Sequence, residues 1–136
     1  MSSDLPTLIE SLAQNARKAS LALNGATAEE KNDALQAIAR GLESNRKLLL
    51  EENQKDLTAA EKNGLPDSMI DRLRLTHERI DAMAQGLRQL IDLPDPVGAV
   101  MEKKIRPNGL EIRKVRVPIG VIGIIYESRP NVTIDC

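Results

Sequence analysis

Residues 118–135 have the sequence PIGVIGIIYESRPNVTID, and the first half of this stretch decides the fold class. From Ile119 to Tyr126 the chain is almost continuously apolar, with two glycines. A short apolar run of this kind is typical of a strand buried on both faces of a sheet. Such a strand needs neighbouring strands and covering helices, and one βαβ unit takes roughly 30 residues. Because the sequence ends at Cys136, we expect an incomplete α/β fold, part of a larger protein.

The first 96 residues are predicted to be helical. Apolar side chains recur at three- and four-residue steps, which indicates amphipathic helices. Asn24-Gly25 and Asn63-Gly64 are typical helix ends. The predicted helices are one through Ile9 to Leu23, one after the N-cap Thr27 with an apolar stripe from Leu35 to Leu42, one over about 45–62, a short one from Pro66 through Leu73, and one after the N-cap Thr76 to Ile91.

Between the helices and the apolar run, the pattern changes to that of a β-hairpin. Residues 92–96, DLPDP, break the last helix because proline removes an N–H donor. Asn108-Gly109 stands between two extended runs, where it is a strong hairpin signal. The return strand alternates apolar and charged side chains, with a slip at Lys114. We therefore expect helices over residues 1–96, a hairpin over 97–117 and the start of a sheet over 118–136.

Composition argues against several classes of function. The net charge is −1 and the chain has one Tyr, no Phe and no Trp, so bases have no stacking platform and no nucleic-acid partner is expected. Residues 101–116 hold six basic and two acidic residues, which fits an anionic partner or, as we favour, the exposed face of a β-ribbon. One cysteine and one histidine predict no disulfide and no metal cluster. We expect a cytoplasmic protein without a membrane segment, because no signal-peptide pattern and no apolar run of about 20 residues occurs.

Three stretches together resemble one enzyme family. Residues 62–76 (KNGLPDSMIDRLRLT), 93–98 (LPDPVG) and 118–135 are similar to those of the γ-glutamyl phosphate reductases, or glutamate-5-semialdehyde dehydrogenases, of the aldehyde dehydrogenase superfamily. The resemblance covers essentially the whole chain and corresponds to the N-terminal third of such enzymes. It implies that the helices belong to the cofactor domain and the hairpin to an oligomerisation ribbon. Residues 119–126 would be the first strand of a Rossmann-like NADP-binding sheet.

The resemblance also implies a reaction. Members of this family are oxidoreductases that convert L-glutamyl 5-phosphate to L-glutamate 5-semialdehyde in proline biosynthesis. A cysteine thiolate displaces phosphate, and NADPH delivers hydride to the resulting thioester. The family's nucleophile lies downstream of the stretch that this chain resembles, so we expect the chain alone to have no catalytic residue and no reductase activity. The expected partners are the substrate, further copies in a homo-oligomer, and glutamate 5-kinase.

The candidate substrate- or cofactor-binding residues follow the predicted strand, because ligands of open α/β sheets bind beyond the carboxyl ends of strands. They are Tyr126, Glu127, Ser128, Arg129, Pro130 and Asn131. By the resemblance, Arg129 stands where aldehyde dehydrogenases typically carry an asparagine that donates to the oxyanion, and Asn131 is a second candidate donor. A guanidinium binds a carboxylate or a phosphate bidentately, and both groups remain open. The alternatives are an ion pair of Arg129 with Glu127, plain solvation, and packing of Tyr126.

Other chemically capable residues have a structural explanation. Cys136 ends VTIDC, which looks like the start of an apolar helix, so we favour a buried structural thiol over a nucleophile. His77 follows a helix cap, where a cation is disfavoured, and is expected to be an exposed first-turn residue. Gly120 and Gly123 match neither a dinucleotide fingerprint nor a Walker loop, and we expect close packing against them.

A different class of function fits the same helices. Residues 1–92 would be a non-enzymatic interaction module, with the tail adding a strand to the sheet of a partner. We disfavour this interpretation because an exposed apolar strand on a free-standing module is an aggregation hazard.

Overall fold

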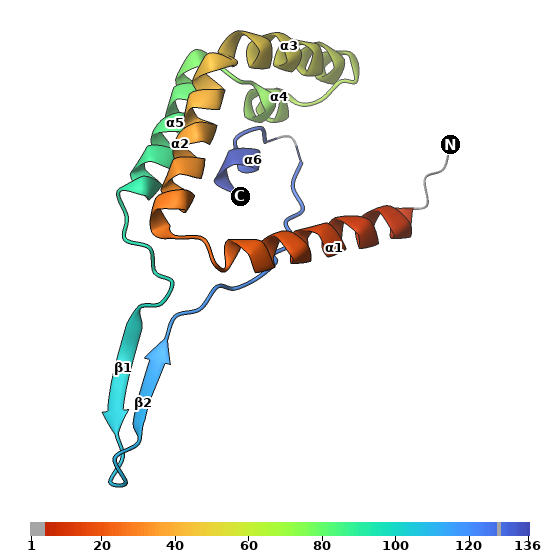
Figure 1. Cartoon of the computed structure of the whole chain (residues 1–136). Helices are drawn as coiled ribbons and strands as arrows, with labels where there is room; N and C mark the ends of the chain where they lie inside the picture. The colour runs from red at the N-terminus through yellow and green to blue at the C-terminus, as the bar shows by residue number, and fades with distance from the viewer. Residues whose placement is uncertain (1–4, 128) are drawn as a thin grey trace. The chain divides into compact units, whose positions relative to one another are not determined.

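Helices and one hairpin make up the regular structure of the chain. The computed structural model describes residues 5–127 and 129–136. Figure 1 shows the elements in order: α1 (Leu5–Leu23), α2 (Ala28–Ser44), α3 (Arg46–Lys62), α4 (Asp67–Leu73), α5 (His77–Ile91), β1 (Val100–Ile105), β2 (Glu111–Val115) and α6 (Val132–Asp135). The five predicted helices and the hairpin are confirmed. Among the described residues, no helix has both the length and the apolar character needed to cross a membrane.

The chain divides into two compact units. The first combines the residues up to Ala28 with 94–123, and therefore holds α1 and the hairpin. The second combines 29–93 with 124–136, and holds nearly all of α2 together with α3, α4, α5 and α6. All of the buried side chains belong to the second unit as far as the structure describes the chain.

The core of the second unit lies between α2 and α5. Ala39 of α2 is buried together with Ala84 and Leu87 of α5, and Ile134 of α6 packs against them. The two helices lie side by side, and small alanine side chains from both helices are buried between them (Figure 1). The contact of Ile134 holds α6, and with it the segment that precedes α6, against this helix pair.

A second apolar cluster joins α3 to α4. Gly64 ends α3 with φ of +71°, the left-handed conformation that the Asn-Gly pair predicted. The turn brings α4 back onto α3, and the loop after α4 is thereby fixed in position. The cluster consists of Leu57, Ala60 and Ile70, with Leu65 and Leu73 packed against it.

Thr76 caps α5, as predicted. Its Oγ1 accepts a hydrogen bond from the backbone N–H of Arg79 at 3.1 Å, and His77 is exposed in the first turn. Hydrogen bonds from the backbone N–H of Glu78 and from the Thr76 hydroxyl hold the pKa of the Glu78 carboxyl below its ordinary value. The start of α5, which borders the site described below, is therefore well defined.

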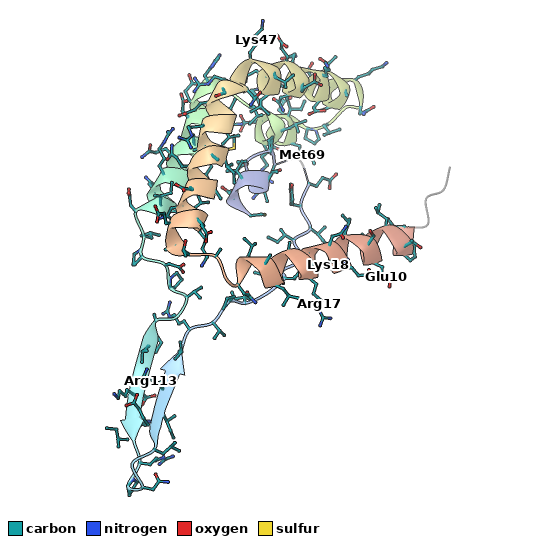
Figure 2. All side chains as sticks on the ribbon, viewed as in Figure 1. Glu10, Arg17, Lys18, Lys47, Met69 and Arg113 are labelled. Atoms are coloured by element: carbon teal, nitrogen blue, oxygen red, sulfur yellow. The ribbon has the colours of Figure 1, made fainter. Side chains whose placement is uncertain are left out.

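The hairpin turns at Asn108-Gly109, as predicted. Gly109 has φ of +82°, and the backbone N–H of Arg106 donates to the carbonyl of Leu110 at 2.9 Å. The strands are exposed on both faces in this chain, and Arg113 projects from β2 (Figure 2). The exposure agrees with the favoured interpretation of the basic residues as the surface of a ribbon.

The predicted slip at Lys114 is a β-bulge. Val100 pairs with Val115 and Glu102 pairs with Lys114, so Met101 is an extra residue on β1. The break in alternation on β2 thus compensates for the residue inserted opposite it.

The predicted strand over residues 119–126 is not formed. The segment has no regular secondary structure, and its side chains are exposed, with Ile119 at 87%. A strand needs hydrogen bonds to a neighbour, and in the described part of the chain only β1 and β2 pair. The predicted burial is therefore wrong for this chain. No atom lies within 4 Å of a Cβ built at Gly120 or Gly123, so the close packing expected there is not found either.

Candidate functional site

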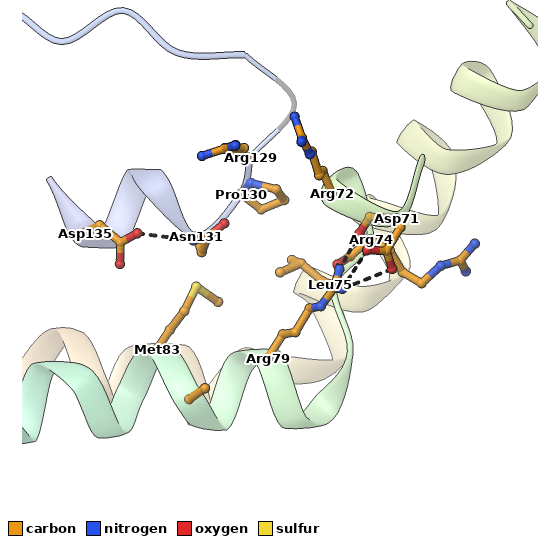
Figure 3. Close-up of a pocket in the computed structure, with 11 residues that line it drawn as sticks. Asp71, Arg72, Arg74, Leu75, Arg79, Met83, Arg129, Pro130, Asn131 and Asp135 are labelled. Atoms are coloured by element: carbon orange, nitrogen blue, oxygen red, sulfur yellow. Dashed lines mark hydrogen bonds and ion pairs between the residues drawn. The ribbon is translucent and has the colours of Figure 1, made fainter. Parts of the chain in front are cut away.

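A pocket of about 450 Å³ opens within the second unit (Figure 3). It lies between the loop after α4, the first half of α5 and the segment that begins α6. Arginine dominates its polar lining, and the apolar part comes from Leu75, Ala82, Met83 and Pro130. The charged and polar lining residues are Asp71, Arg72, Arg74, Arg79, Arg129, Asn131 and Asp135.

Arg79 has a structural role in this pocket. Its Nη2 lies 3.0 Å and 3.2 Å from the two carboxylate oxygens of Asp71, and its Nη1 donates to the backbone carbonyls of Asp71 and Arg74. Arg79 therefore neutralises Asp71 and ties the loop after α4 to α5.

Arg72, Arg74 and Arg129 have no ion-pair partner among residues 5–127 and 129–136. The predicted alternative pairing of Arg129 with Glu127 is thus absent there. Figure 3 shows these three side chains directed apart, with Arg72 pointing up, Arg129 to the left and Arg74 to the right. Two unpaired guanidinium groups on one pocket favour an anionic ligand.

Three of the six predicted site residues line this pocket: Arg129, Pro130 and Asn131. The side-chain amide of Asn131 donates to Oδ2 of Asp135 at 3.1 Å, so it orients a carboxylate at the pocket wall. Sequence reasoning identified Arg129 without Arg72, because the two residues lie far apart in the chain and only the fold brings them to one pocket.

The remaining predicted residues lie elsewhere. Tyr126 lines a neighbouring cavity of about 320 Å³, and its hydroxyl forms a hydrogen bond of 2.8 Å with Thr133 Oγ1. Glu127 is exposed and lines neither cavity, while Ser128 lies outside the described residues. Cys136 follows the short helix α6, as predicted, but it is exposed, so the prediction of a buried thiol is wrong for this chain.

Asn53 of α3 holds the loop after α4 in position next to the pocket. Its side chain is buried, and its Nδ2 donates to the carbonyl of Leu73 at 2.9 Å while its Oδ1 accepts from the N–H of Leu75 at 2.7 Å. These two bonds clamp the loop after α4, which carries Arg74. Sequence reasoning missed Asn53, although Leu49 and Leu57 at four-residue steps on either side place it on the apolar stripe of α3.

The described residues do not fit a metal ion or a nicotinamide cofactor. No group of three or more His, Cys, Asp or Glu side chains in this part of the chain could hold a metal. The glycines at 120 and 123 lie in an unpaired segment, so they do not form the strand–turn–helix that binds a dinucleotide.

Comparisons with known proteins show which enzymes the chain is similar to. No family model matches the chain. Over all 136 residues the chain is 53% identical to the gamma-glutamyl phosphate reductase of Opitutus terrae. The chain is a homologue of this enzyme. Over 123 residues it is also 50% identical to the gamma-glutamyl phosphate reductase of Geobacillus thermodenitrificans. The match covers 32% of the first relative and 30% of the second, so the chain spans about a third of their length.

Solved structures of gamma-glutamyl phosphate reductase have the same fold. The Thermotoga maritima structure matches with a TM-score of 0.87 and 48% identity, over 90% of this chain and 30% of that one. The Saccharomyces cerevisiae structure matches with a TM-score of 0.88 and 36% identity, over 92% of this chain and 32% of that one. The resemblance that the sequence indicated is confirmed, and the matched part is the N-terminal region.

Proposed function

We propose that the chain serves in the reduction of L-glutamyl 5-phosphate to L-glutamate 5-semialdehyde, a step of proline biosynthesis. The observation that carries the proposal is the 53% identity, over the whole chain, to a relative named gamma-glutamyl phosphate reductase. Because the relatives are about three times longer, the proposal concerns an enzyme of their length. The reductant would be NADPH, the nucleophilic cysteine would lie outside these 136 residues, and the enzyme would be cytoplasmic.

The arginine-rich pocket supports an acidic substrate. L-Glutamyl 5-phosphate carries a carboxylate at one end and an acyl phosphate at the other, and guanidinium groups bind both kinds of anion. The role of this chain is therefore to bind and orient the substrate through Arg72 and Arg129. NADPH supplies hydride when it is bound, and we assign it no contact with the described residues because they do not fit it.

The hairpin supports a homo-oligomer. Its strands expose Val100, Ile112 and Val115 at 52%, 43% and 42%, and their outer edges are unpaired in the described chain. A second copy would cover such a surface. We also propose glutamate 5-kinase as the partner that supplies the labile acyl phosphate.

A chimaera tests the proposed function. The 136 residues would replace the matched segment of the Opitutus terrae enzyme, whose alignment covers the entire chain. With glutamate semialdehyde and inorganic phosphate, the chimaera should reduce NADP⁺ in the reverse reaction, with kcat/KM within about tenfold of the parent enzyme. The isolated 136-residue chain should show no turnover.

The parent enzyme is the control for expression and assembly. A chimaera with the parent's circular dichroism and oligomeric state but no activity would contradict the proposed function. Steady turnover by the isolated chain would contradict the placement of the nucleophile outside it.

A further inference from the structure

A hydrogen bond between two side chains brackets the Arg129 loop, by which we mean residues 129–132. The hydroxyl of Tyr126, at the end of the apolar segment, lies 2.8 Å from Oγ1 of Thr133 in α6. The two residues stand on either side of the loop, so the bond ties its entry to its exit. From Pro118 to Tyr126 the sequence offers no other side chain that forms hydrogen bonds, and no neighbour can replace this hydroxyl.

The two ends of the Arg129 loop differ in their other support. On the α6 side, Ile134 packs against the buried cluster of α2 and α5, and the N–H groups of Ile134 and Asp135 both donate to the carbonyl of Asn131 at 2.9 Å. On the other side, residues 119–125 have no regular secondary structure. The Tyr126 hydroxyl is therefore the contact by which the fixed end of the loop orients the unsupported end.

Arg129 is the charged residue that this bond affects. It lines both the pocket of about 450 Å³ and the neighbouring cavity of about 320 Å³, and Tyr126 and Thr133 line the second cavity with it. The guanidinium of Arg129 forms no ion pair within the described part of the chain. Its position therefore depends on the backbone that carries it, which lies between the two hydroxyl groups.

We propose that Tyr126 is a positioning residue for substrate binding, which acts through Thr133 to hold the loop that carries Arg129. The inference rests on the proposed function, in which Arg129 binds an anionic group of the substrate. A guanidinium contributes fully to binding only when the surrounding contacts fix its geometry. Loss of the hydroxyl frees the Tyr126 end of the loop, and Arg129 then spends less time in the binding position.

Kinetics of the Opitutus terrae chimaera test this role. Tyr126→Phe removes the hydroxyl and keeps the ring, and Thr133→Val removes its partner. In the reverse reaction each variant should raise the KM for glutamate semialdehyde or for inorganic phosphate about fivefold, whereas kcat and the KM for NADP⁺ should stay within about twofold. The double variant should resemble either single variant. Thr133→Ser keeps the hydroxyl and should have the KM values of the unmodified chimaera.

Dependence on Arg129 separates positioning from a general loss of structure. In a chimaera that carries Arg129→Gln, adding Tyr126→Phe should raise the KM no further, because the group that Tyr126 positions is already absent. Thr58→Val is the matched control. Its hydroxyl donates to the carbonyl of Gln54 within α3, and it lines neither cavity, so its loss should leave every KM unchanged.

Hydrogen–deuterium exchange of the same chimaeras needs no turnover. Peptides that span residues 129–135 should exchange at least about threefold faster in Tyr126→Phe than in the unmodified chimaera or in Thr58→Val. This region includes the N–H of Val132, which donates to the carbonyl of Arg129 at 3.1 Å.

The two measurements distinguish the possible failures. Unchanged exchange over residues 129–135 would overturn the proposal whether or not the chimaera is active. Faster exchange with unchanged KM values, or with a raised KM for NADP⁺ alone, would also overturn it. A folded, unmodified chimaera without turnover would refute the reductase function instead, and the exchange data would still show whether Tyr126 holds the loop.

Discussion

At the scale of single residues, the amide of Asn53 determines where the pocket loop lies. It satisfies one carbonyl and one N–H on either side of Arg74, and it does so from a helix about twenty positions earlier in the chain. In buried surroundings, a polar group left without its partner costs about 1–3 kcal/mol. The loop geometry therefore depends on Asn53, a side chain that does not itself line the pocket of about 450 Å³.

Replacing Asn53 with alanine should lower the free energy of unfolding by about 1–3 kcal/mol, because the backbone groups of Leu73 and Leu75 lose their partner. Urea unfolding followed by circular dichroism measures the change. Gln54→Ala is the matched control, since Gln54 is the exposed neighbour on the same helix and its loss should cost less than about 0.5 kcal/mol. Equal decreases in the free energy of unfolding for the two variants would show that the hydrogen bonds of Asn53 do not stabilise the fold.

Residue roles could be predicted from the sequence where they depend on local chemistry. The cap at Thr76 and the left-handed turn at Gly109 each follow from a few adjacent residues, and both are confirmed. That Arg72 and Arg129 line one pocket depends on how α4 and the segment before α6 pack in the second unit, which no local pattern contains. Asn53 is intermediate, because its position on an apolar stripe signals a buried hydrogen bond but not its partners.

At the scale of elements, two glycines differ in whether the backbone requires a glycine at that position. Gly41 lies in the interior of α2 with no atom within 4 Å of a built Cβ, so its flexibility weakens the helix without serving a contact. Gly109 has the positive φ that the hairpin turn requires. The same substitution should therefore have opposite effects at these two positions.

Gly41→Ala should stabilise the chain by roughly 0.5–1 kcal/mol, and Gly109→Ala should destabilise the hairpin by about 1–2 kcal/mol. The urea midpoint reports the first change. Hydrogen exchange at the Arg106 amide, which closes the turn, reports the second and should become faster. Each variant is the control for the other. If both variants were stabilised, or both were destabilised, the predicted difference between the helix position and the turn position would be wrong.

The elements themselves could be predicted well because their signals are periodic and local. The helix stripes, the Asn-Gly turns and the slip at Lys114 all have structural counterparts, the last as the bulge at Met101. The segment 119–126 is the exception. Its composition predicts a strand, but a strand is defined by its neighbours, and none of the described residues pairs with it.

At the scale of the whole molecule, this apolar segment is the most conspicuous exposed feature. Ile122 and Ile124 are 62% and 51% exposed, in a stretch that is uncharged from Pro118 through Tyr126. Unpaired apolar segments of high β-propensity are templates for association with other chains. We therefore expect the 136-residue chain to self-associate through this segment.

Lysine at both Ile122 and Ile124 should reduce self-association, measured by sedimentation equilibrium, because charge on an unpaired strand opposes edge-to-edge pairing. The control places lysines at Leu21 and Leu23 of α1, which are similarly exposed at 66% and 62%, and should change association less. If the unmodified chain is monomeric at high concentration, or if both variants act alike, the prediction is wrong. A monomeric chain would favour the helical-module interpretation.

The hydrogen bond from Leu75 to Asn53 also gives a way to detect ligand binding in the pocket by hydrogen exchange. The amide proton of Leu75 is held by Asn53 and lies in the pocket wall, so its exchange with water requires the loop to lift away from α3. A ligand that binds only the closed loop lengthens the lifetime of that proton by the factor 1 + L/Kd, where L is the free ligand concentration. The exchange rate of this single amide proton, which takes no part in any reaction, thus reports ligand binding in the pocket.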